Sequence, residues 1–481
     1  MTNDIIKPMP FEGKPVLHCP RVFGASPDKE ILWRIPATGK RPLSFWAKLP
    51  EGLAVNDGIV SGKVKSDGDY PVTITVKNDL GEASQTVIFK IHDRGVMLTP
   101  LMGWCSWNAY RDAVTQEDIL TTADFFISSG LADYGYRFVN VDSTWQGHRD
   151  ENGVIVPNEK FPDMKKMCDE IHKKGLCCGI YATPMRNAWG WEGEKWGLPG
   201  VTDGEMDERF PKRMGGIGLI HHEEENARRW AEWGFDYLKY DWDRCEPENA
   251  MLMYDALGKT GRDFGLCFTI HACMEYKDTW LKTCNSWRDN YFDSDDDWNI
   301  LTKVYNSGKP WHTVIREGHF FDYDMLETGY MMDRENRFSK GEQMFCVAMR
   351  AFFNSPLQIS CDVKHITEFD MALLCNENIL SIQRDTFSPG ARLREAIIEK
   401  GKYAEVYDKP LNDGKTAVAF FNLGDEPLDM KYKLTLGAKA DVLNAWTGER
   451  FTVTDIINQT VNAHEAVIYI LTEKHIDYCT A

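Results

Sequence analysis

The hydrophobic and polar positions change their period twice along the chain. From about residue 14 to residue 93, apolar and polar residues alternate, most clearly over 72–76 and 87–91. Alternation with period two is typical of half-buried strands, and the Asn-Asp-Leu-Gly segment at 78–81 predicts a hairpin between the two runs. We therefore predict that residues 1–96 form a small β-sandwich.

Short apolar runs alternate with amphipathic segments from residue 98 to about residue 384. Thr115 and Asp118 have the spacing of a capping box, which predicts the start of a helix. Eight short strands are expected, at 101–107, 136–142, 175–182, 235–241, 264–270, 286–292, 311–315 and 357–360. This βα rhythm over residues 97–388 predicts a (β/α)8 TIM barrel.

The helical pattern stops near residue 391. Short apolar runs at 417–421, 431–436, 441–445 and 466–471 are separated by Gly, Asn and Asp. We predict a C-terminal antiparallel β-sandwich over residues 389–481. The chain is thus expected to be a multidomain protein, with a central barrel flanked by two all-β domains.

The stretch around which we expect the chemistry to be organised is YLKYD at 237–241. Side chains alternate across a strand, so Lys239 and Asp241 share one face, and Asp241 ends the strand. In a TIM barrel the carboxyl ends of the strands carry the active site. We interpret Asp241 as a catalytic nucleophile beside Lys239. A purely structural Lys–Asp pair is the alternative.

A carboxylate nucleophile at the end of a barrel strand is compatible with cleavage of a glycosidic bond, a reaction that requires a second carboxylate. The best candidate is Asp293, rather than Asp289 or Asp295, in the segment WRDNYFDSDDDW at the end of the sixth predicted strand. We expect Asp293 to act first as the general acid and then as the base. Carboxyl groups about 5–5.5 Å apart would indicate retention through a glycosyl-enzyme intermediate.

Six segments, in order, resemble motifs of the α-galactosidase (melibiase) family, glycoside hydrolase family 27. TPLMGWCSWN at 99–108 is similar to the family's TPPMGWNSWN, and VNVDSTWQ at 139–146 to its INIDDCWQ. The others are GIY at 179–181, YLKYD at 237–241, DYDML at 322–326 (family DPDML) and NENILSIQRD at 376–385 (family NKEVIAINQD). Residues 43–91 resemble the immunoglobulin-like modules that precede many bacterial glycosidase barrels.

The resemblance implies a retaining glycosidase with Asp241 as nucleophile and Asp293 as acid/base. It implies that the sugar pocket is lined by Trp107, Asp142, Tyr181, Lys239, Arg288, Asp324 and Met325.

Two departures from the family pattern predict an altered sugar specificity. Ser143 stands where the family has the second of two paired acids, and His271 ends a motif that usually ends in an acid or a small residue. We expect both to bind substrate. The spacing between Arg288 and the following acid is also one residue longer than in the family. The family also holds α-N-acetylgalactosaminidase, β-L-arabinopyranosidase and isomaltodextranase activities.

The composition of the chain limits the classes of molecule that it is expected to bind. The net charge of −18, from 55 basic and 73 acidic residues, argues against nucleic acid or an anionic membrane surface and favours a neutral carbohydrate, a galactoside or a related glycoside. Neither a membrane span, nor a cofactor, nor a metal is expected, and the oligomeric state is left open. The protein is expected to be periplasmic or secreted if a signal peptide was removed, and cytoplasmic otherwise.

Two alternatives stay open at this stage. One is a catalytically silent carbohydrate-binding protein on the same fold. The other is a metal-dependent barrel enzyme that uses Cys105, Cys245, His271 and Cys273.

Overall fold

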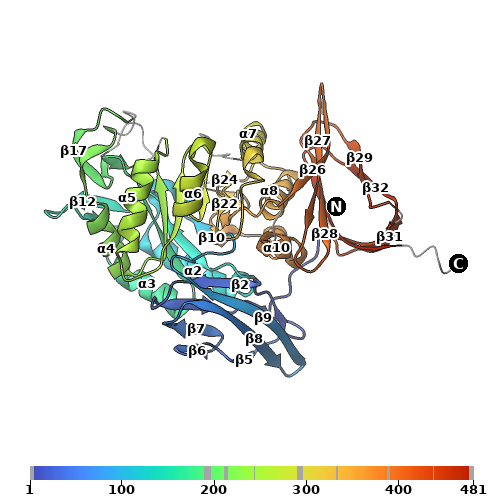
Figure 1. Cartoon of the computed structure of the whole chain (residues 1–481), viewed down its shortest axis with the longest axis horizontal. Coiled ribbons are helices and arrows are strands. Elements are labelled where there is room, and N and C mark those ends of the chain that lie inside the picture. The colour runs from blue at the N-terminus through green and yellow to red at the C-terminus, as the bar shows by residue number, and fades with distance from the viewer. Residues whose placement is uncertain are drawn as a thin grey trace.

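The computed structural model describes residues 5–188, 197–210, 215–242, 244–289, 296–331, 334–386, 390–436 and 438–475. Figure 1 shows three regions in chain order: N-terminal strands in blue, a central region of strands and helices from cyan to light orange, and C-terminal strands in deep orange.

The N-terminal region contains two larger sheets with a common hydrophobic cluster, and a two-stranded sheet of β1 (Val16–Leu17) and β4 (Ala37–Thr38). The four-stranded sheet has the order β2 (Val22–Ala25), β9 (Gly81–Ile91), β8 (Gly68–Asn78) and β5 (Ser44–Ala47). The three-stranded sheet has the order β3 (Ile31–Arg34), β7 (Ile59–Gly62) and β6 (Leu53–Asn56). The predicted hairpin is confirmed, because β8 and β9 pair antiparallel up to Asn78 and Gly81. The immunoglobulin-like character of this region and the three domain boundaries stay predictions.

The central region is built on a curled, eight-stranded parallel sheet. In spatial order its strands are β22 (Phe320–Phe321), β21 (Ser286–Trp287), β20 (Gly265–Thr269), β19 (Tyr237–Asp241), β14 (Cys177–Ala182), β11 (Phe138–Val141), β10 (Met102–Cys105) and β25 (Leu357–Ile359). A parallel bridge between Leu326 and Ile359 joins the chain just after β22 to β25. The two edges of the sheet therefore meet.

Seven of the eight expected barrel strands are confirmed, and the one placed at 311–315 is wrong. Lys309–Trp311 is a 3-10 helix followed by a turn, and the seventh strand is β22. Trp311, Val314 and Ile315 are spaced as neighbours on one face of a helix, and Trp311 and Ile315 are buried. The apolar run therefore belongs to a 3-10 helix and the turn after it, in which the Val314 and Ile315 N–H groups donate back to Trp311 O, and not to a strand.

Helices flank the sheet. They are α2 (Gln116–Ser128), α3 (Met164–Lys173), α4 (Glu223–Trp233), α5 (Pro247–Gly258), α6 (Lys277–Thr283), α7 (Trp298–Gly308), α8 (Lys340–Phe352), α9 (Glu368–Leu374) and α10 (Glu377–Arg384). The predicted capping box is present at the start of α2, where Thr115 accepts from the Asp118 backbone and the Asp118 side chain accepts from Thr115.

The C-terminal region is a pair of antiparallel sheets. The larger has the order β26 (Arg392–Glu399), β27 (Lys402–Pro410), β28 (Thr416–Asn422), β33 (Ala466–His475), β30 (Ala438–Asn444) and β31 (Arg450–Thr454). The smaller pairs β29 (Leu428–Lys433) with β32 (Ile456–Val461). Buried residues of both sheets form one hydrophobic cluster, which confirms a C-terminal sandwich.

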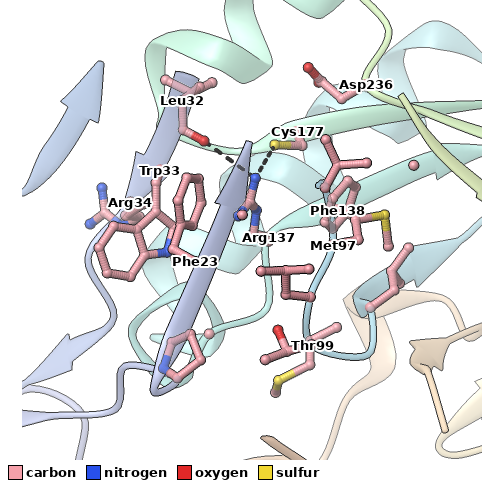
Figure 2. A pocket seen from close by; sticks show the side chains of 18 of the residues that line it. Phe23, Leu32, Trp33, Arg34, Met97, Thr99, Arg137, Phe138, Cys177 and Asp236 are labelled. Carbon is pink, nitrogen blue, oxygen red and sulfur yellow. Dashed lines mark hydrogen bonds between the residues drawn. The ribbon is translucent and has the colours of Figure 1, made fainter. Parts of the chain in front are cut away.

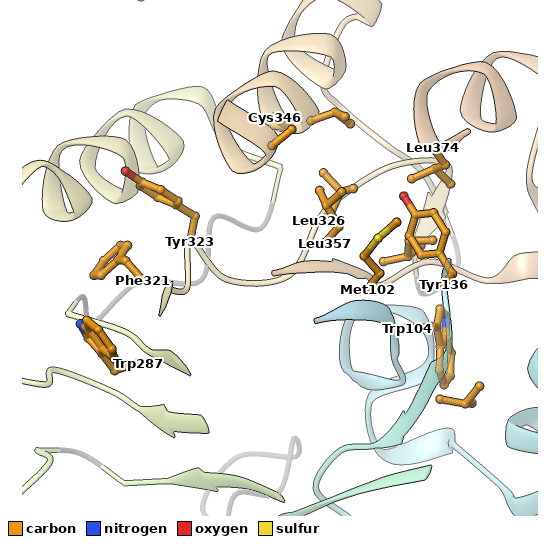
Figure 3. Close-up of a cluster of buried hydrophobic side chains, with 14 of the residues drawn as sticks. Met102, Trp104, Tyr136, Trp287, Phe321, Tyr323, Leu326, Cys346, Leu357 and Leu374 are labelled. Carbon is orange, nitrogen blue, oxygen red and sulfur yellow. The ribbon is translucent and has the colours of Figure 1, made fainter. Parts of the chain in front are cut away.

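A single hydrophobic cluster extends from the barrel to the C-terminal sheets. Figure 3 shows part of it, with Trp104 of β10 and Leu357 of β25 near the closure and Trp287 of β21 further round the sheet. The same cluster includes Phe421 and Ile468 of the C-terminal sheet. The barrel and the C-terminal sandwich therefore share a core.

The N-terminal region packs against the end of the barrel where its strands begin. A cavity of about 120 Å³ lies at this contact, and Figure 2 shows Phe23 and Trp33 on one side of it and Phe138 and Cys177 on the other. Arg137 crosses the contact and donates to Leu32 O (3.3 Å) and to Cys177 Sγ (3.1 Å). Asp241 stands at the other end of its strand, so the N-terminal region packs on the barrel far from Asp241.

Candidate active site

The carboxyl group of Asp241 ends β19 in a buried position. Asp241 pairs in register with Thr269 of β20, and only 7% of Asp241 is exposed. Its Oδ1 accepts no hydrogen bond within the described ranges. Burial raises the pKa of Asp241 to about 6, against the opposing effect of the Lys239 ammonium group. A carboxylate kept this poorly solvated is a strong candidate for chemistry.

The hydrogen-bonded partner of Lys239 is Asp142 and not Asp241. Lys239 Nζ donates to Asp142 Oδ2 at 2.8 Å, and both side chains are buried. Asp142 follows β11, which is separated from β19 by β14. Burial alone lowers the pKa of Lys239, but the Asp142 carboxylate, together with Cys105 and Asp241, outweighs this effect and the pKa is raised overall. The alternative of a Lys239–Asp241 structural pair is therefore wrong.

Asp142 receives further hydrogen bonds that fix its carboxylate. Cys105 Sγ donates to Oδ2 (3.0 Å), and the backbone N–H of Ser143 donates to Oδ1 (2.7 Å). Burial raises the pKa of Asp142, but Lys239, Cys105 and Ser143 together hold it below its ordinary value. Asp142 is therefore anionic at neutral pH. The Ser143 side chain is buried beside it.

Tyr181 stands next to this ion pair on the intervening strand. It pairs in register with Lys239, whose Nζ lies 5.7 Å from the centre of the Tyr181 ring. Tyr181, Lys239, Asp142 and Asp241 thus lie close together at the carboxyl ends of three neighbouring strands, as the sequence predicts.

Arg288 connects the carboxyl ends of β21 and β22, which lie beyond β20 in the sheet. Its Nε lies 2.9 Å from Asp322 Oδ2, and its Nη1 forms a shorter contact with Asp324 Oδ1. All three side chains are almost fully buried. Despite the changed spacing in its motif, Arg288 is therefore held by two carboxylates at this end of the barrel.

Asp324 has an uncommon backbone conformation. Its φ is +69°, which a residue other than glycine adopts only when its surroundings hold it there. Its backbone N–H donates to Asp322 Oδ1 (2.9 Å), and its own Oδ1 accepts from the Met325 N–H (2.7 Å). These bonds define a tight turn that presents Asp324 and Met325 together.

Trp107 and Met325 form an apolar cluster with Cys105. Trp107 begins the short helix α1 (Trp107–Tyr110), and the Arg111 guanidinium lies 4.8 Å from the centre of the Trp107 ring. Since Cys105 also bonds to Asp142, this apolar cluster adjoins the charged one. An apolar face beside carboxylates suits a sugar, which has both CH and OH surfaces.

His271 lies between β20 and β21. Its Nδ1 is 3.1 Å from Asp289 Oδ1, and Asp289 Oδ2 accepts from Trp311 Nε1 (3.1 Å). About a third of the His271 side chain is exposed, and its φ is +58°. Burial raises the pKa of Asp289, while Trp311 and His271 oppose the rise. Contact of His271 with substrate stays a prediction.

Asp293, the expected acid/base, lies outside the described residues. Asp322, which links Arg288 to the Asp324 turn, was missed as a site residue although it begins the DYDML motif. Arg350, which binds the same turn from α8, carried no signal in the sequence.

The residues considered for a metal site do not gather in the part of the chain that the structure describes. That part contains no group of three or more His, Cys, Asp or Glu side chains placed to hold a metal ion. Cys245 donates instead to Ile270 O (3.0 Å). Among the described helices, none is both long and apolar enough to cross a membrane.

Comparison with known proteins agrees with this geometry. The family model described as alpha galactosidase A matches residues 99–198 and 207–385, and the model of the alpha galactosidase C-terminal β-sandwich domain matches residues 401–471. α-Galactosidase 2 of Arabidopsis thaliana is 29% identical over 400 residues, which cover 79% of this chain and 91% of the relative. α-Galactosidase 3 of the same plant is 30% identical over 405 residues, covering 80% and 84%.

A solved structure extends the likeness to nearly the whole chain. It is a proposed α-galactosidase/melibiase of Bacteroides fragilis, 28% identical, with a TM-score of 0.84 and coverage of 96% of this chain and 99% of that one. The barrel fold and the matches to α-galactosidases identify the chain as a barrel glycosidase. The chain belongs to the α-galactosidase (melibiase) family, glycoside hydrolase family 27.

Proposed function

We propose that this glycosidase hydrolyses its carbohydrate substrate with retention of configuration, and that its sugar preference differs from that of an ordinary α-galactosidase. The observation that carries the proposal is the buried carboxyl group of Asp241 at the end of β19, next to the Lys239–Asp142 pair. The catalytic roles below rest on this position and on the family motifs.

In the first step, an Asp241 carboxylate oxygen attacks the anomeric carbon and forms a bond to it. The bond from that carbon to the leaving oxygen breaks, and Asp293 gives its proton to this oxygen. In the second step Asp293 takes a proton from water, the water oxygen bonds to the anomeric carbon, and Asp241 leaves as a carboxylate. Both displacements invert the carbon, so the product retains the substrate's configuration.

The surroundings of Asp241 favour this role. The nearby charge of Lys239 opposes protonation of the carboxyl, yet Lys239 is hydrogen-bonded to Asp142. Among the described residues, Asp241 is therefore not neutralised by an ion-pair partner of its own. An anion that is poorly solvated in this way keeps its nucleophilic character.

Asp142, Arg288, Asp324 and Met325 are proposed to bind the sugar, with Trp107 and Tyr181 supplying aromatic surface. Ser143 offers a neutral hydroxyl where the family has a second charged acid. A hydrogen bond to a charged group is worth about 1.5–3 kcal/mol, so its loss changes which sugar hydroxyls are recognised. His271 adds a ring nitrogen on the other side of Asp241. We therefore propose weak activity on plain α-galactosides and better activity on a related or modified pyranoside.

The stereochemistry of the first product tests the retaining mechanism. The enzyme is mixed with a nitrophenyl glycoside that it cleaves, and the anomers are followed by NMR before they equilibrate. We expect the anomer of the substrate to accumulate first. Early accumulation of the opposite anomer would show that water attacks directly and that Asp241 is not a nucleophile.

A panel of nitrophenyl glycosides tests the specificity. The panel contains α-galactoside, α-N-acetylgalactosaminide, β-L-arabinopyranoside and α-glucoside, and kcat/KM is compared. Preference for α-galactoside over every other member would refute the altered specificity and leave the retaining mechanism intact.

A further inference from the structure

Arg350 is a buried charge outside the proposed catalytic machinery. It lies near the end of α8, is 0% exposed, and points its guanidinium at the turn that carries Asp324. Figure 3 shows that turn from the side of the barrel, with the chain between Tyr323 and Leu326 running beneath the helix that carries Cys346.

The guanidinium donates to the carbonyls of three consecutive residues. Nε donates to Asp324 O (3.1 Å), and Nη2 donates to Tyr323 O (2.9 Å) and to Met325 O (2.8 Å). Nη1 donates within its own helix, to Cys346 O (3.2 Å). The carboxylate of Glu327, also buried, lies 4.0 Å from Nη2. The cost of burying the charge is therefore offset by this ion pair together with the backbone oxygens, three of which belong to one turn.

Three successive carbonyls do not converge on one point in an extended chain, where they alternate in direction. They converge here because Asp324 has a φ of +69°. The same kink lets the Asp324 and Met325 backbone N–H groups bond to Asp322 and Asp324. Arg350 thus binds only the kinked form of the turn and stabilises it against the extended form.

We infer that Arg350 is a positioning residue for substrate binding, which acts by holding the Asp324–Met325 turn in its kinked conformation. It does not touch the sugar. The inference rests on the proposed function, because it requires that Asp324 and Met325 bind the substrate.

Arg350→Lys tests the inference, because an ammonium group keeps the charge but cannot span three carbonyls as a planar guanidinium does. Nitrophenyl α-galactoside is used as the probe, well below the Tm of each variant. We expect KM to rise about 10- to 100-fold, the range of a lost charge-assisted hydrogen bond. We expect kcat to stay within about threefold, since a contact made equally in the ground and transition states is what is lost.

A second readout reports on the turn itself. Hydrogen exchange of peptides covering residues 320–328 should accelerate in Arg350→Lys, since the Asp324 and Met325 amides are bonded only in the kinked turn. Arg262→Lys is the matched control. Arg262 binds Phe235 O and Asp236 at the start of β19, the opposite end of the barrel. The Arg262→Lys variant should have a lower Tm than the wild type and an unchanged KM.

The outcomes distinguish the positioning role of Arg350 from the proposed contact between Asp324 and the sugar. Asp324→Ala is measured in parallel and should raise KM by itself. If Asp324→Ala raises KM and Arg350→Lys lowers only Tm, the positioning role is overturned and the sugar contact stands. If Asp324→Ala leaves KM unchanged, the proposed sugar contact fails and the inference falls with it. Arg350→Gln, which can still donate to one carbonyl, replaces Arg350→Lys if that variant does not fold.

Discussion

Replacing Asp241 by asparagine should abolish hydrolysis and yet stabilise the protein at neutral pH. Burial raises the pKa of Asp241 from an ordinary value of 3.8 to about 6. A raised carboxyl pKa means that the folded state prefers the protonated form. The contribution of Asp241 to stability is therefore fully present below pH 3.8 and is lost as the pH rises through about 6.

The magnitude follows from the two pKa values. At about 1.4 kcal/mol per pH unit, ionisation of Asp241 destabilises the folded state by about 3 kcal/mol at pH 7.5 and by less than about 1 kcal/mol at pH 4. The amide of the Asp241→Asn variant never ionises, but it must be buried, at a cost of about 1–2 kcal/mol. The net gain at pH 7.5 is about 1–2 kcal/mol, or roughly 1–2 °C in Tm for a chain of 481 residues.

The cost of burying the asparagine amide does not depend on pH. Comparing the two proteins at two pH values therefore isolates the free energy of ionising Asp241. Scanning calorimetry of wild type and Asp241→Asn at pH 7.5 and pH 4 should show the advantage of the variant falling by about 2 kcal/mol on acidification. A difference in Tm that stays constant between the two pH values would refute the assignment of a raised pKa to Asp241.

Asp142→Asn is the matched control, since it removes a carboxylate that is similarly buried but whose pKa is shifted in the opposite direction. The pKa of Asp142 is lowered, so its contribution is present above pH 3.8 and is lost as the pH falls through its folded value. The substitution leaves Lys239 buried without its ion partner, which destabilises by about 3–5 kcal/mol. Opposite signs for two buried aspartates, at strand ends separated by one strand, would be hard to explain by packing alone.

Three further predictions concern activity. The kcat/KM of the wild type should fall as the pH drops below about 6, because only ionised Asp241 attacks; a plateau extending down to pH 4 would contradict the pKa or the role. Asp293→Ala should slow substrates with poor leaving groups most and be partly rescued by azide; the same pattern in Asp289→Ala alone would move the acid/base to Asp289. Ser143→Asp should shift the kcat/KM ratio towards nitrophenyl α-galactoside, and an unchanged ratio would leave His271, or the long segment over 183–221, as the determinant.

The sequence determined the parts of the structure that local pattern encodes. Period-two alternation was enough to predict the hairpin of β8 and β9. The spacing of Thr115 and Asp118 was enough to predict the helix cap, because its hydrogen bonds join residues within one turn. The βα rhythm and the strand-end position of Asp241 followed in the same way. Each of these features depends on residues that are close in the chain.

Tertiary structure decided the rest, because burial and ion pairing depend on neighbours from other strands. The strand expected at 311–315 failed since barrel strands are short and buried on both faces, so their apolar runs carry no period that separates them from a helix. The sequence placed Lys239 with Asp241, but the sheet order brings Asp142 to Lys239 from two strands away and leaves Asp241 with a raised pKa. The role of Arg350 could not be predicted from the sequence pattern either, because its hydrogen bonds go to backbone carbonyls, which a pattern of side chains does not record.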